Sequence, residues 1–387
     1  MNAQQLYLRL SSFYFAYFLM LGAFAPFFGL YLKDLGFSSL QIGVLLAIMP
    51  VVRTALPTLW GWIADHYGHR RALIRLTSVA ATLVCAGLLL GTSFGWLFAV
   101  LVVLNVFWCA ALPLVEATTF GLLKGRLGDY GRIRVWGSVS FVLAVLATGP
   151  ALDRAGVGIL PALLVVLFAA VAASAWLLPA DETPAHHEEH ASLGRILRRP
   201  EVAALFVACF LMSLAHGPYN SFYSIHLVDL GYSKTAVSWL WTISVVAEIG
   251  VFLWMPHLLK RVSIANVIAL SLGCAVVRFL LIGWLAQVQV ALVLAQLLHA
   301  ATFGAHHAAA LAAIHHFFRG RFQARGQGLY TALGFGAGGA AGAVLSGWLW
   351  DHVGAGLTFT FGAAAALVAL VVVLARLRLP AVAHAGA

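Results

Sequence analysis

Long apolar stretches alternate with short polar ones along the whole chain. A helix needs about twenty consecutive apolar residues to cross the hydrocarbon core of a bilayer, and the chain has room for twelve such stretches. The breaks between them hold most of the charged residues, a pattern that is typical of membrane-crossing helices joined by exposed loops. The predicted spans are 10–32, 40–62, 72–93, 96–120, 133–155, 157–179, 201–228, 236–257, 263–285, 288–317, 326–350 and 354–377.

Composition supports an all-α membrane protein. Of the 387 residues, 62% are hydrophobic and only 9% are charged, with a mean hydropathy of +0.95, whereas soluble domains have about 25% charged residues. The first apolar run is too long for the apolar core of a signal peptide, so we expect it to remain as the first span. The four cysteines all lie in predicted spans without the spacing of metal ligands, and we expect no disulfide and no metal.

The formal net charge of +10 could indicate nucleic-acid binding, but its distribution indicates membrane topology instead. Eighteen of the 23 Lys and Arg residues fall on the side of the N-terminus, Lys33, Arg154 and Lys234 fall on the other, and Arg53 and Arg278 lie within spans. Basic residues concentrate on the cytoplasmic side of membrane proteins. We therefore expect cytoplasmic N- and C-termini, a bacterial inner (plasma) membrane location and no nucleic-acid partner.

Short motifs recur between the two halves of the chain. The sequence Asp34-Leu-Gly-Phe-Ser38 returns 195 residues later as Asp229-Leu-Gly-Tyr-Ser233, and 61–68 is echoed by 347–354 as Gly-Trp-x-x-Asp-His-x-Gly. Such parallel repeats indicate two six-helix bundles. The predicted domains are 1–179 and 201–387, joined by a cytoplasmic linker at 180–200.

The linker contains a polar cluster, His186-His-Glu-Glu-His190. A short His-rich tract can bind metal, but a solvated cytoplasmic linker explains the cluster without a ligand. We expect the second alternative.

One loop motif identifies a family. Gly61-x-x-x-Asp65-x-x-Gly68-x-Arg70-Arg71 stands between the second and third spans. Its first glycine permits close helix approach, Asp65 marks a helix end, Gly68 permits a tight turn, and the arginines belong in water. The motif resembles the signature loop of the major facilitator superfamily of transporters.

A second motif, Gly131-Arg132-Ile-Arg134, resembles the branch that contains the lactose permease and the 3-phenylpropionic acid transporters. The resemblance extends along nearly the whole chain. It implies a twelve-helix secondary transporter working by alternating access, with the lipid bilayer and a small-molecule substrate as partners, the substrate site between the two halves, and a monomeric state. We expect Arg132 and Arg134 to belong with the first loop to the conformational machinery.

Departures from the lactose permease bear on the substrate. Where that permease has its sugar-ligating carboxylate, its proton-carrying glutamate on helix 10 and its lysine on helix 11, this chain has Phe120, Thr302 and a position near Phe335. A galactoside is therefore not expected. The resemblance favours proton-coupled uptake of a small organic solute such as an aromatic acid. Proton-coupled export of sugars or drugs on the same fold stays open. No nucleophile–base or metal-ligand pattern indicates an enzyme.

Four charged residues lie well inside predicted spans: Arg53, Glu116, Glu248 and Arg278. Inserting such a residue costs roughly 2.5–3.5 kcal/mol on translocon scales, so each is expected to face a cavity or a partner. Arg53 and Glu248 stand 195 residues apart, at equivalent places in the two halves. Glu116 either takes part in transport or forms a structural ion pair with Arg134.

Histidine titrates near physiological pH, and a buried carboxylate can carry a proton there too. The predicted proton-coupling residues are Glu248, Arg278, His299 and His307, with His299 supported by resemblance to the helix-10 histidine of the permease branch. The proton itself is the coupling ion, and no cofactor is expected. A packing role for each histidine remains the alternative.

Polar and aromatic residues in spans are candidates for substrate contact, although such residues more commonly serve packing. The predicted substrate-binding residues are Tyr17, Arg53, Glu116, Tyr219, Asn220 and Trp241. Gly334, Gly338 and Gly342 recur every four residues in the eleventh span, a spacing that permits close helix packing in membranes.

Overall fold

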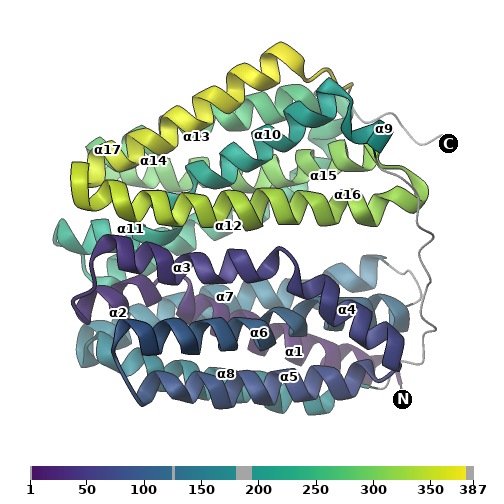
Figure 1. The fold of residues 1–387 in the computed structure, drawn as a ribbon, viewed down its shortest axis with the longest axis vertical. Helices are drawn as coiled ribbons and strands as arrows, with labels where there is room; N and C mark the ends of the chain where they lie inside the picture. Colours follow the sequence, from purple (N-terminus) through teal and green to yellow (C-terminus); the bar gives the residue numbers. More distant parts are fainter. Residues whose placement is uncertain (1, 124–126, 180–193, 381–387) are drawn as a thin grey trace. The chain divides into compact units, whose positions relative to one another are not determined.

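The computed structural model describes residues 2–123, 127–179 and 194–380. The regular secondary structure of the described residues is all helical, without strands, and eleven helical segments are long and apolar enough to cross a membrane. The all-α membrane fold is thereby confirmed. The eleventh segment, Gln323–Arg376, has 54 residues, and the chain turns back inside it at Gly354, whose φ is 76° (Figure 1). The predicted eleventh and twelfth spans correspond to its two arms.

Contacts group the described residues into two compact units. The first contains the residues up to Phe37, those from Val51 to the linker, and the short segment Ser233–Ser238. The second contains Ser38–Pro50, and the remainder from Gly194 onward. The predicted linker cluster at 186–190 lies outside the described residues.

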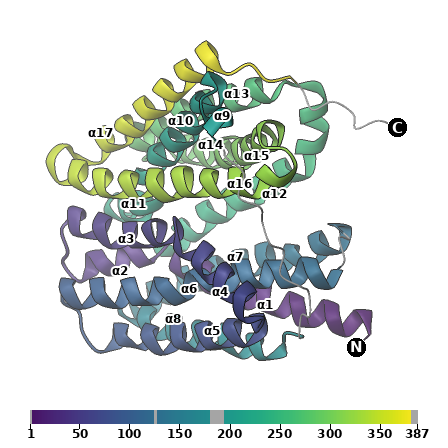
Figure 2. The same cartoon turned by 45° about the vertical axis from the view of Figure 1, so that its right-hand side comes forward.

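Successive spans of the first unit run in opposite directions from one end of the bundle to the other (Figures 1 and 2). Its elements are α1 (Ala3–Phe24), α2 (Phe28–Asp34), α4 (Leu56–Tyr67), α5 (Arg70–Cys85), η1 (Ala86–Leu89), α6 (Phe94–Leu123), α7 (Leu127–Ala155), η2 (Val157–Ile159) and α8 (Leu160–Leu177). The first span breaks between α1 and α2 at Pro26, because proline cannot donate the backbone hydrogen bond that continues a helix. Helix α1 packs against α7 and α8.

The second unit holds the C-terminal helices and most of one helix from the N-terminal half. Its elements are α3 (Ser39–Arg53), α9 (Gly194–Leu197), α10 (Pro200–Ala215), α11 (Gly217–Asp229), α12 (Lys234–Arg261), α13 (Ile264–Leu285), α14 (Gln289–His299), η3 (Ala300–Ala305), α15 (His306–Phe317), η4 (Gly320–Phe322), α16 (Gln323–Tyr330), η5 (Thr331–Gly338) and α17 (Gly339–Arg376). The first turns of α12 group with the first unit. Segments η3 and η5 are π-helical, a form that is frequent at functional sites.

Glycines let α17 and the preceding η5 lie directly on α10, as the four-residue spacing predicts. A Cβ at Gly338 would lie 2.5 Å from the carbonyl oxygen of Phe210, and one at Gly342 would lie 2.7 Å from that of Leu214. Side chains do not come this close to backbone oxygens, so only glycine permits the contact.

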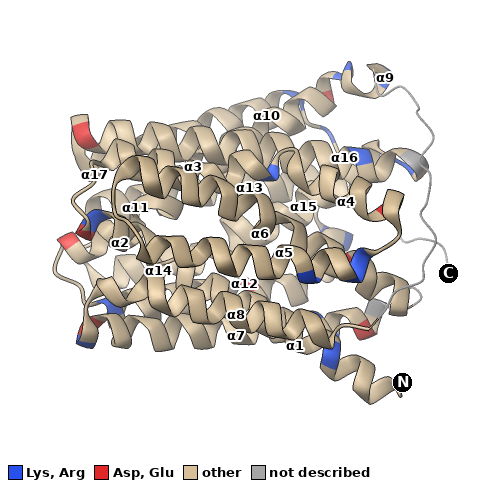
Figure 3. Cartoon of the chain, turned by 60° about the horizontal axis from the view of Figure 1, so that its bottom comes forward, with Lys and Arg blue, Asp and Glu red and all other residues tan. Residues whose placement is uncertain are grey.

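The charged residues gather mainly at the ends of the helices, and the middle of each helix is largely free of them (Figure 3). Large apolar side chains such as Leu253 and Leu374 expose 75% and 70% of their surface. Such exposure is expected where the surrounding solvent is lipid.

Candidate functional site

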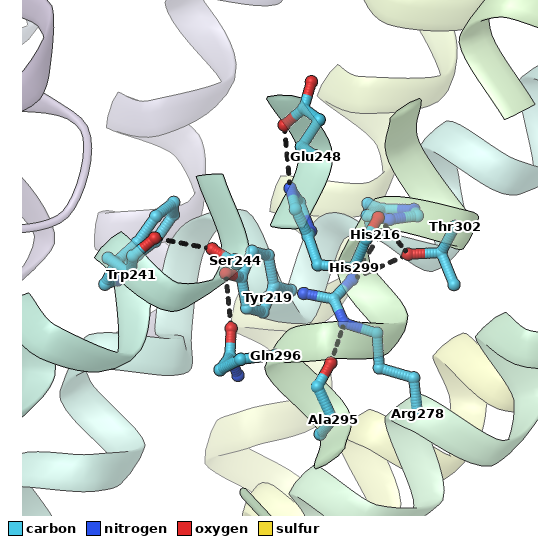
Figure 4. Close-up of polar contacts among 10 residues, drawn as sticks. All are labelled: His216, Tyr219, Trp241, Ser244, Glu248, Arg278, Ala295, Gln296, His299 and Thr302. Carbon is cyan, nitrogen blue, oxygen red and sulfur yellow. Dashed lines mark hydrogen bonds and ion pairs between the residues drawn. The ribbon is translucent and has the colours of Figure 1, made fainter. Parts of the chain in front are cut away.

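A buried polar cluster lies within the second unit (Figure 4). It combines residues from the break between α10 and α11, from α11 itself, and from α12, α13, α14 and η3. Its members are His216, Tyr219, Trp241, Ser244, Glu248, Arg278, Gln296, His299 and Thr302. Four of them, Arg278, His216, Gln296 and Thr302, expose at most 4% of their surface, so this part of the cluster is shielded from solvent and lipid.

Arg278 on α13 is fully buried and is held mainly by neutral groups. Its Nε–H donates to the carbonyl oxygen of Ala295 at 3.1 Å, and Nη1 donates to Thr302 Oγ1 at 3.2 Å. The guanidinium carbon lies 4.0 Å from the ring centre of Tyr219, close enough for cation–π attraction. Nη2 has no hydrogen-bond partner among the described residues. The cluster therefore contains a permanent positive charge with an unused donor.

His216 caps the break between α10 and α11 and contacts Arg278 directly. Its Nδ1 lies 2.8 Å from the carbonyl oxygen of Met212, and Nε2 lies 3.3 Å from Arg278 Nη1. Because the carbonyl can only accept and the guanidinium can only donate, these contacts assign a neutral ring with its hydrogen on Nδ1. His216 therefore positions Arg278 and cannot take up a proton while both bonds persist.

The acidic member of the cluster is Glu248 on α12. His299 Nε2 lies 3.5 Å from Glu248 Oε2, and their side chains expose 9% and 16% of their surface. A Cβ added at Gly304 in η3 would lie 3.0 Å from Glu248 Cγ, so the π-helical backbone also approaches this side chain closely. The Nδ1 atom of His299 has no partner among the described residues. Glu248 and His299 thus form a pair that can share or pass a proton.

Aromatic rings cover the cluster on one side. Tyr219 packs against Trp241 and His299 at ring-centre distances of 5.0 and 5.5 Å. The hydroxyl of Tyr219 donates to Gln296 Oε1 at 3.1 Å, and Gln296 Nε2 donates to the hydroxyl of Tyr223 at 2.7 Å. These bonds fix the ring of Tyr219 over Arg278.

Two further residues predicted for this unit lie elsewhere. His307 is separated from His299 by the ring of Phe303, and its Nδ1 lies 2.9 Å from the hydroxyl of Tyr330 on α16. Asn220 is exposed on α11, next to the buried Tyr219. The structure therefore brings Tyr219, Trp241, Glu248, Arg278 and His299 together, with His307 forming a second polar contact.

The candidates of the first unit form two groups. The Arg53 guanidinium carbon lies 5.7 Å from the ring centre of Trp108, and Tyr17, which is 2% exposed, interacts electrostatically with Arg53.

Glu116 on α6 belongs to the other group. It accepts a hydrogen bond of 3.4 Å from the hydroxyl of Tyr130 and interacts electrostatically with Arg134, whose guanidinium carbon lies 4.0 Å from the ring centre of Phe18. Both the structural and the transport interpretation of Glu116 remain compatible with this arrangement.

The signature loop follows α4. Gly68 ends the helix with φ of 68° and its N–H donates to the carbonyl of Ala64, as the predicted tight turn requires. Arg70 donates to Asp65 at 2.8 Å. The close helix approach expected at Gly61 is not found, because no atom of another described helix lies within 4 Å of the position of a Cβ there.

The remaining arginines of the conformational motifs lie at helix starts. Arg71 is in the first turn of α5, and Arg132 is near the start of α7 with its guanidinium 5.8 Å from the ring centre of Tyr7.

Sequence analysis missed several polar residues that the structure brings into contact. Gln296 lies one turn before His299 on α14, and this spacing on one helix face is a signal that could have linked them. Asp153 and Asp351 each cap another helix. The signal for these was a shared Gly-x-x-x-Asp-x-x-Gly pattern at 149–156 and 347–354.

Comparisons with known proteins place the chain among transporters. The model of the MFS_1 like family matches residues 7–361. The probable 3-phenylpropionic acid transporter of Escherichia coli K12 is 30% identical over 361 residues, covering 92% of this chain and 93% of that protein. The maltose permease of Geobacillus stearothermophilus is 27% identical over 274 residues, covering 69% and 68%.

Solved structures agree in fold. The crystal structure of the nucleoside transporter NupG superposes with a TM-score of 0.84 at 19% identity, over 97% of this chain and 99% of that one. At this identity the likeness concerns the fold alone. Together with the family match and the membrane-spanning helices, it shows a multi-pass membrane transporter and not an enzyme. The chain belongs to the MFS_1-like family of the major facilitator superfamily, and it is a secondary transporter of small molecules.

Proposed function

We propose that the protein is a proton-coupled symporter that takes up a small organic acid bearing an apolar ring, of the 3-phenylpropionate kind. The observation that carries the proposal is the pair of formal charges in the buried cluster, Arg278 and Glu248, which are linked through His299 and Tyr219. The relative of 30% identity, described as a probable 3-phenylpropionic acid transporter, supports the substrate class.

The two charges provide a physical reason for coupling. With Glu248 ionised, the formal charges of Glu248 and Arg278 cancel. With Glu248 protonated, the cluster has a net charge of +1, and an organic anion is attracted at short range by several kcal/mol. Proton and carboxylate therefore favour each other's binding, which is the thermodynamic requirement for symport. One proton carried with one monocarboxylate leaves the transported pair electrically neutral.

The other predicted site residues take supporting roles in this proposal. Glu248 carries the proton, His299 exchanges it, and His307 with Tyr330 forms a further proton-holding contact on the same helix face. Arg53 provides a second cation for the substrate carboxylate. Tyr17, Glu116, Tyr219, Asn220 and Trp241 are proposed to contact the substrate, with Tyr219 and Trp241 facing its ring.

The test is uptake of labelled 3-phenylpropionate by proteoliposomes that contain the purified protein. For one proton per monocarboxylate, an inside-alkaline gradient of one pH unit should give about tenfold accumulation, since one unit corresponds to 1.36 kcal/mol. A protonophore should abolish accumulation, and an imposed membrane potential without a pH gradient should not drive it. Protein-free liposomes provide the control for passive entry of the neutral acid.

Two results would contradict the proposal. Folded protein that moves no 3-phenylpropionate would exclude this acid, and sugars, nucleosides and drugs should then be tried in both directions. Extrusion of a solute that is driven by proton entry would establish the alternative, a proton-coupled exporter.

The proposed topology places both termini in the cytoplasm of a bacterial cell, with the protein a monomer in the inner membrane. Impermeant labelling of a terminal tag in intact cells tests the orientation, because a cytoplasmic tag is labelled only after the cells are lysed. Light scattering of the purified protein tests the monomer.

A further inference from the structure

Two aspartates cap the starts of two helices in the same way. Asp153 at the end of α7 accepts hydrogen bonds from the backbone N–H groups of Lys234 and Thr235 at 2.9 and 2.8 Å. Asp351 in α17 accepts them from Ser39 and Leu40 at 3.1 and 2.9 Å. In both cases the donors are the first two residues of the capped helix, α12 or α3.

The serine that precedes each helix completes the cap. Ser233 Oγ accepts from Ala236 N–H at 3.1 Å, and Ser38 Oγ accepts from Gln41 N–H at 3.2 Å. A helix start leaves four N–H groups without partners within the helix and has a partial positive charge. A local serine satisfies one of these groups, and a carboxylate from a distant helix satisfies two more. The carboxylate also meets the positive end of the helix dipole.

The surrounding glycines show that the contacts are built into the packing. Gly149 and Gly347 stand four residues before the two aspartates, and a Cβ at either would overlap the carbonyl oxygen of the first residue of the capped helix, Lys234 or Ser39. Three residues after each aspartate, a glycine with positive φ follows, Gly156 at 81° and Gly354 at 76°. Because the same pattern occurs in both halves of the chain, the contacts are unlike a chance contact at a single site.

The position of the caps assigns them to one face of the membrane. Helices α3 and α4 form one span, so Ser39 stands at the end opposite the signature loop at Asp65. Helix α12 begins at the equivalent point of the repeat, six spans later, and consecutive spans cross in alternating directions. Both caps therefore lie on the face opposite the signature loop.

We propose that Asp153 and Asp351 are a pair of gating residues that hold the ends of α12 and α3 closed on this face, and that both caps must break when the face opens. Opening would separate α3 from α17 and α12 from α7, which exposes helix-start N–H groups and removes a favourable charge–dipole contact. The aspartates thus set the population of the conformation that is closed on this face. This inference does not depend on the substrate or on proton coupling.

Buried serines next to the caps serve as reporters in a protein whose four cysteines are replaced by alanine. Ser346 on α17 and Ser238 on α12 are both fully buried. The variants Ser346→Cys and Ser238→Cys are reacted with a maleimide in nanodiscs, without substrate and without a pH gradient. The labelling rate then reports opening alone, so the result is independent of the proposed substrate.

The expected result is faster labelling when the carboxylates become amides. Asp351→Asn should raise the rate at Ser346→Cys about threefold, and the double variant Asp153→Asn/Asp351→Asn about tenfold, since an amide keeps one acceptor oxygen and loses the charge. Asp351→Glu, which keeps the charge, should stay closer to the parent rate. The matched control is Asp34→Asn, which removes a carboxylate from the turn that leads into α3 without removing a cap.

Equal labelling rates for the double variant and the Asp34→Asn control, in protein of unchanged thermal stability, would overturn the inference. If the double variant does not fold, the single variants decide in the same way: Asp351→Asn at the parent rate overturns the proposal, and a faster rate that Asp351→Glu restores supports it.

Discussion

His299 Nε2 lies 3.5 Å from Oε2 of Glu248, and this contact joins α14 to α12 within the second unit. Packing holds both side chains in place, because His299 also lies against Tyr219, and Glu248 lies against the π-helical backbone at Gly304. Glu248 has the only carboxylate among the residues labelled in Figure 4. Its protonation therefore decides whether the charge of Arg278 is balanced.

Replacing Glu248 by Gln should separate proton coupling from substrate movement. The amide is permanently neutral, so the cluster stays in the state that attracts an anion but can no longer gain or lose a proton. We expect accumulation driven by a pH gradient to fall to the level of protein-free liposomes, while exchange of internal for external substrate persists. Both are measured with labelled substrate in proteoliposomes.

The matched control is Glu201→Gln, which neutralises a carboxylate in the first turn of α10, outside the cluster and the proposed substrate contacts. It should retain pH-driven accumulation if proton coupling belongs to the cluster around Arg278. Full accumulation by Glu248→Gln would remove Glu248 from the coupling mechanism, whatever the control does.

Hydropathy predicted the spans because the bilayer imposes a minimum apolar length on every crossing helix. The loop turn at Gly68 and the packing at Gly338 were also accessible, since a positive φ and close helix contact both favour glycine. The exposed position of Asn220 beside the buried Tyr219 could not be predicted from the sequence. Which face of a helix points inward depends on its rotation, and this is set by neighbours that are distant in sequence.

The polar contacts of the cluster could be predicted only in part from the sequence, for the same reason. Glu248, Arg278 and His299 were identified as charged or titratable residues inside spans, where their insertion cost indicates a function. The partners of Arg278, namely His216 and Thr302, depend on a helix break and a π-helical segment. The break has a signal in the pair Gly217-Pro218, whereas the π-helical segment has no clear signal in the local sequence.

Gly342→Ala should destabilise the second unit. The added Cβ would lie 2.7 Å from the carbonyl oxygen of Leu214 and 3.1 Å from the Cα of Gly217. Because both obstacles are backbone atoms, α17 must shift away from α10, at a cost of about 1–3 kcal/mol. Thermal unfolding of the purified protein measures the effect as a lower midpoint.

Gly273→Ala is the control for this change. Gly273 lies inside α13, and nothing stands within 4 Å of its Cβ position. Alanine is favoured over glycine in a helix by about 0.5–1 kcal/mol, so the midpoint should rise or stay unchanged. A midpoint for Gly342→Ala as high as that of Gly273→Ala would show that α10 and α17 do not pack as described.

The two glycines of the signature loop should respond differently to alanine. Gly68 has φ of 68°, a left-handed conformation that costs an alanine about 1–2 kcal/mol. Gly61 lies within α4 with free space around its Cβ position, so alanine is accommodated there. We expect Gly68→Ala to lower both the unfolding midpoint and the transport rate, and Gly61→Ala to leave the midpoint unchanged. A loss of transport in Gly61→Ala at full stability would indicate that a helix approaches Gly61 during the transport cycle.

Arg278→Lys should abolish most transport while keeping the positive charge. The guanidinium donates in three directions, to Ala295, Thr302 and His216, and the compact ammonium of lysine cannot reproduce this planar arrangement. A lost hydrogen bond from a charged donor costs about 1.5–3 kcal/mol, so the transport rate should fall at least about tenfold. Initial rates in proteoliposomes measure the loss, and elution of the variant as a single peak confirms that it is folded.

Arg75→Lys is the matched control, because Arg75 also donates to backbone carbonyl oxygens, those of Ala175 and Trp176, but lies in α5 outside the cluster. It should retain near-normal transport, because its two bonds are exposed or only part-buried and neither of them holds a residue of the cluster. If Arg278→Lys transports as well as Arg75→Lys, the positive charge alone suffices, and the fixed geometry of the guanidinium has no part in binding the acid.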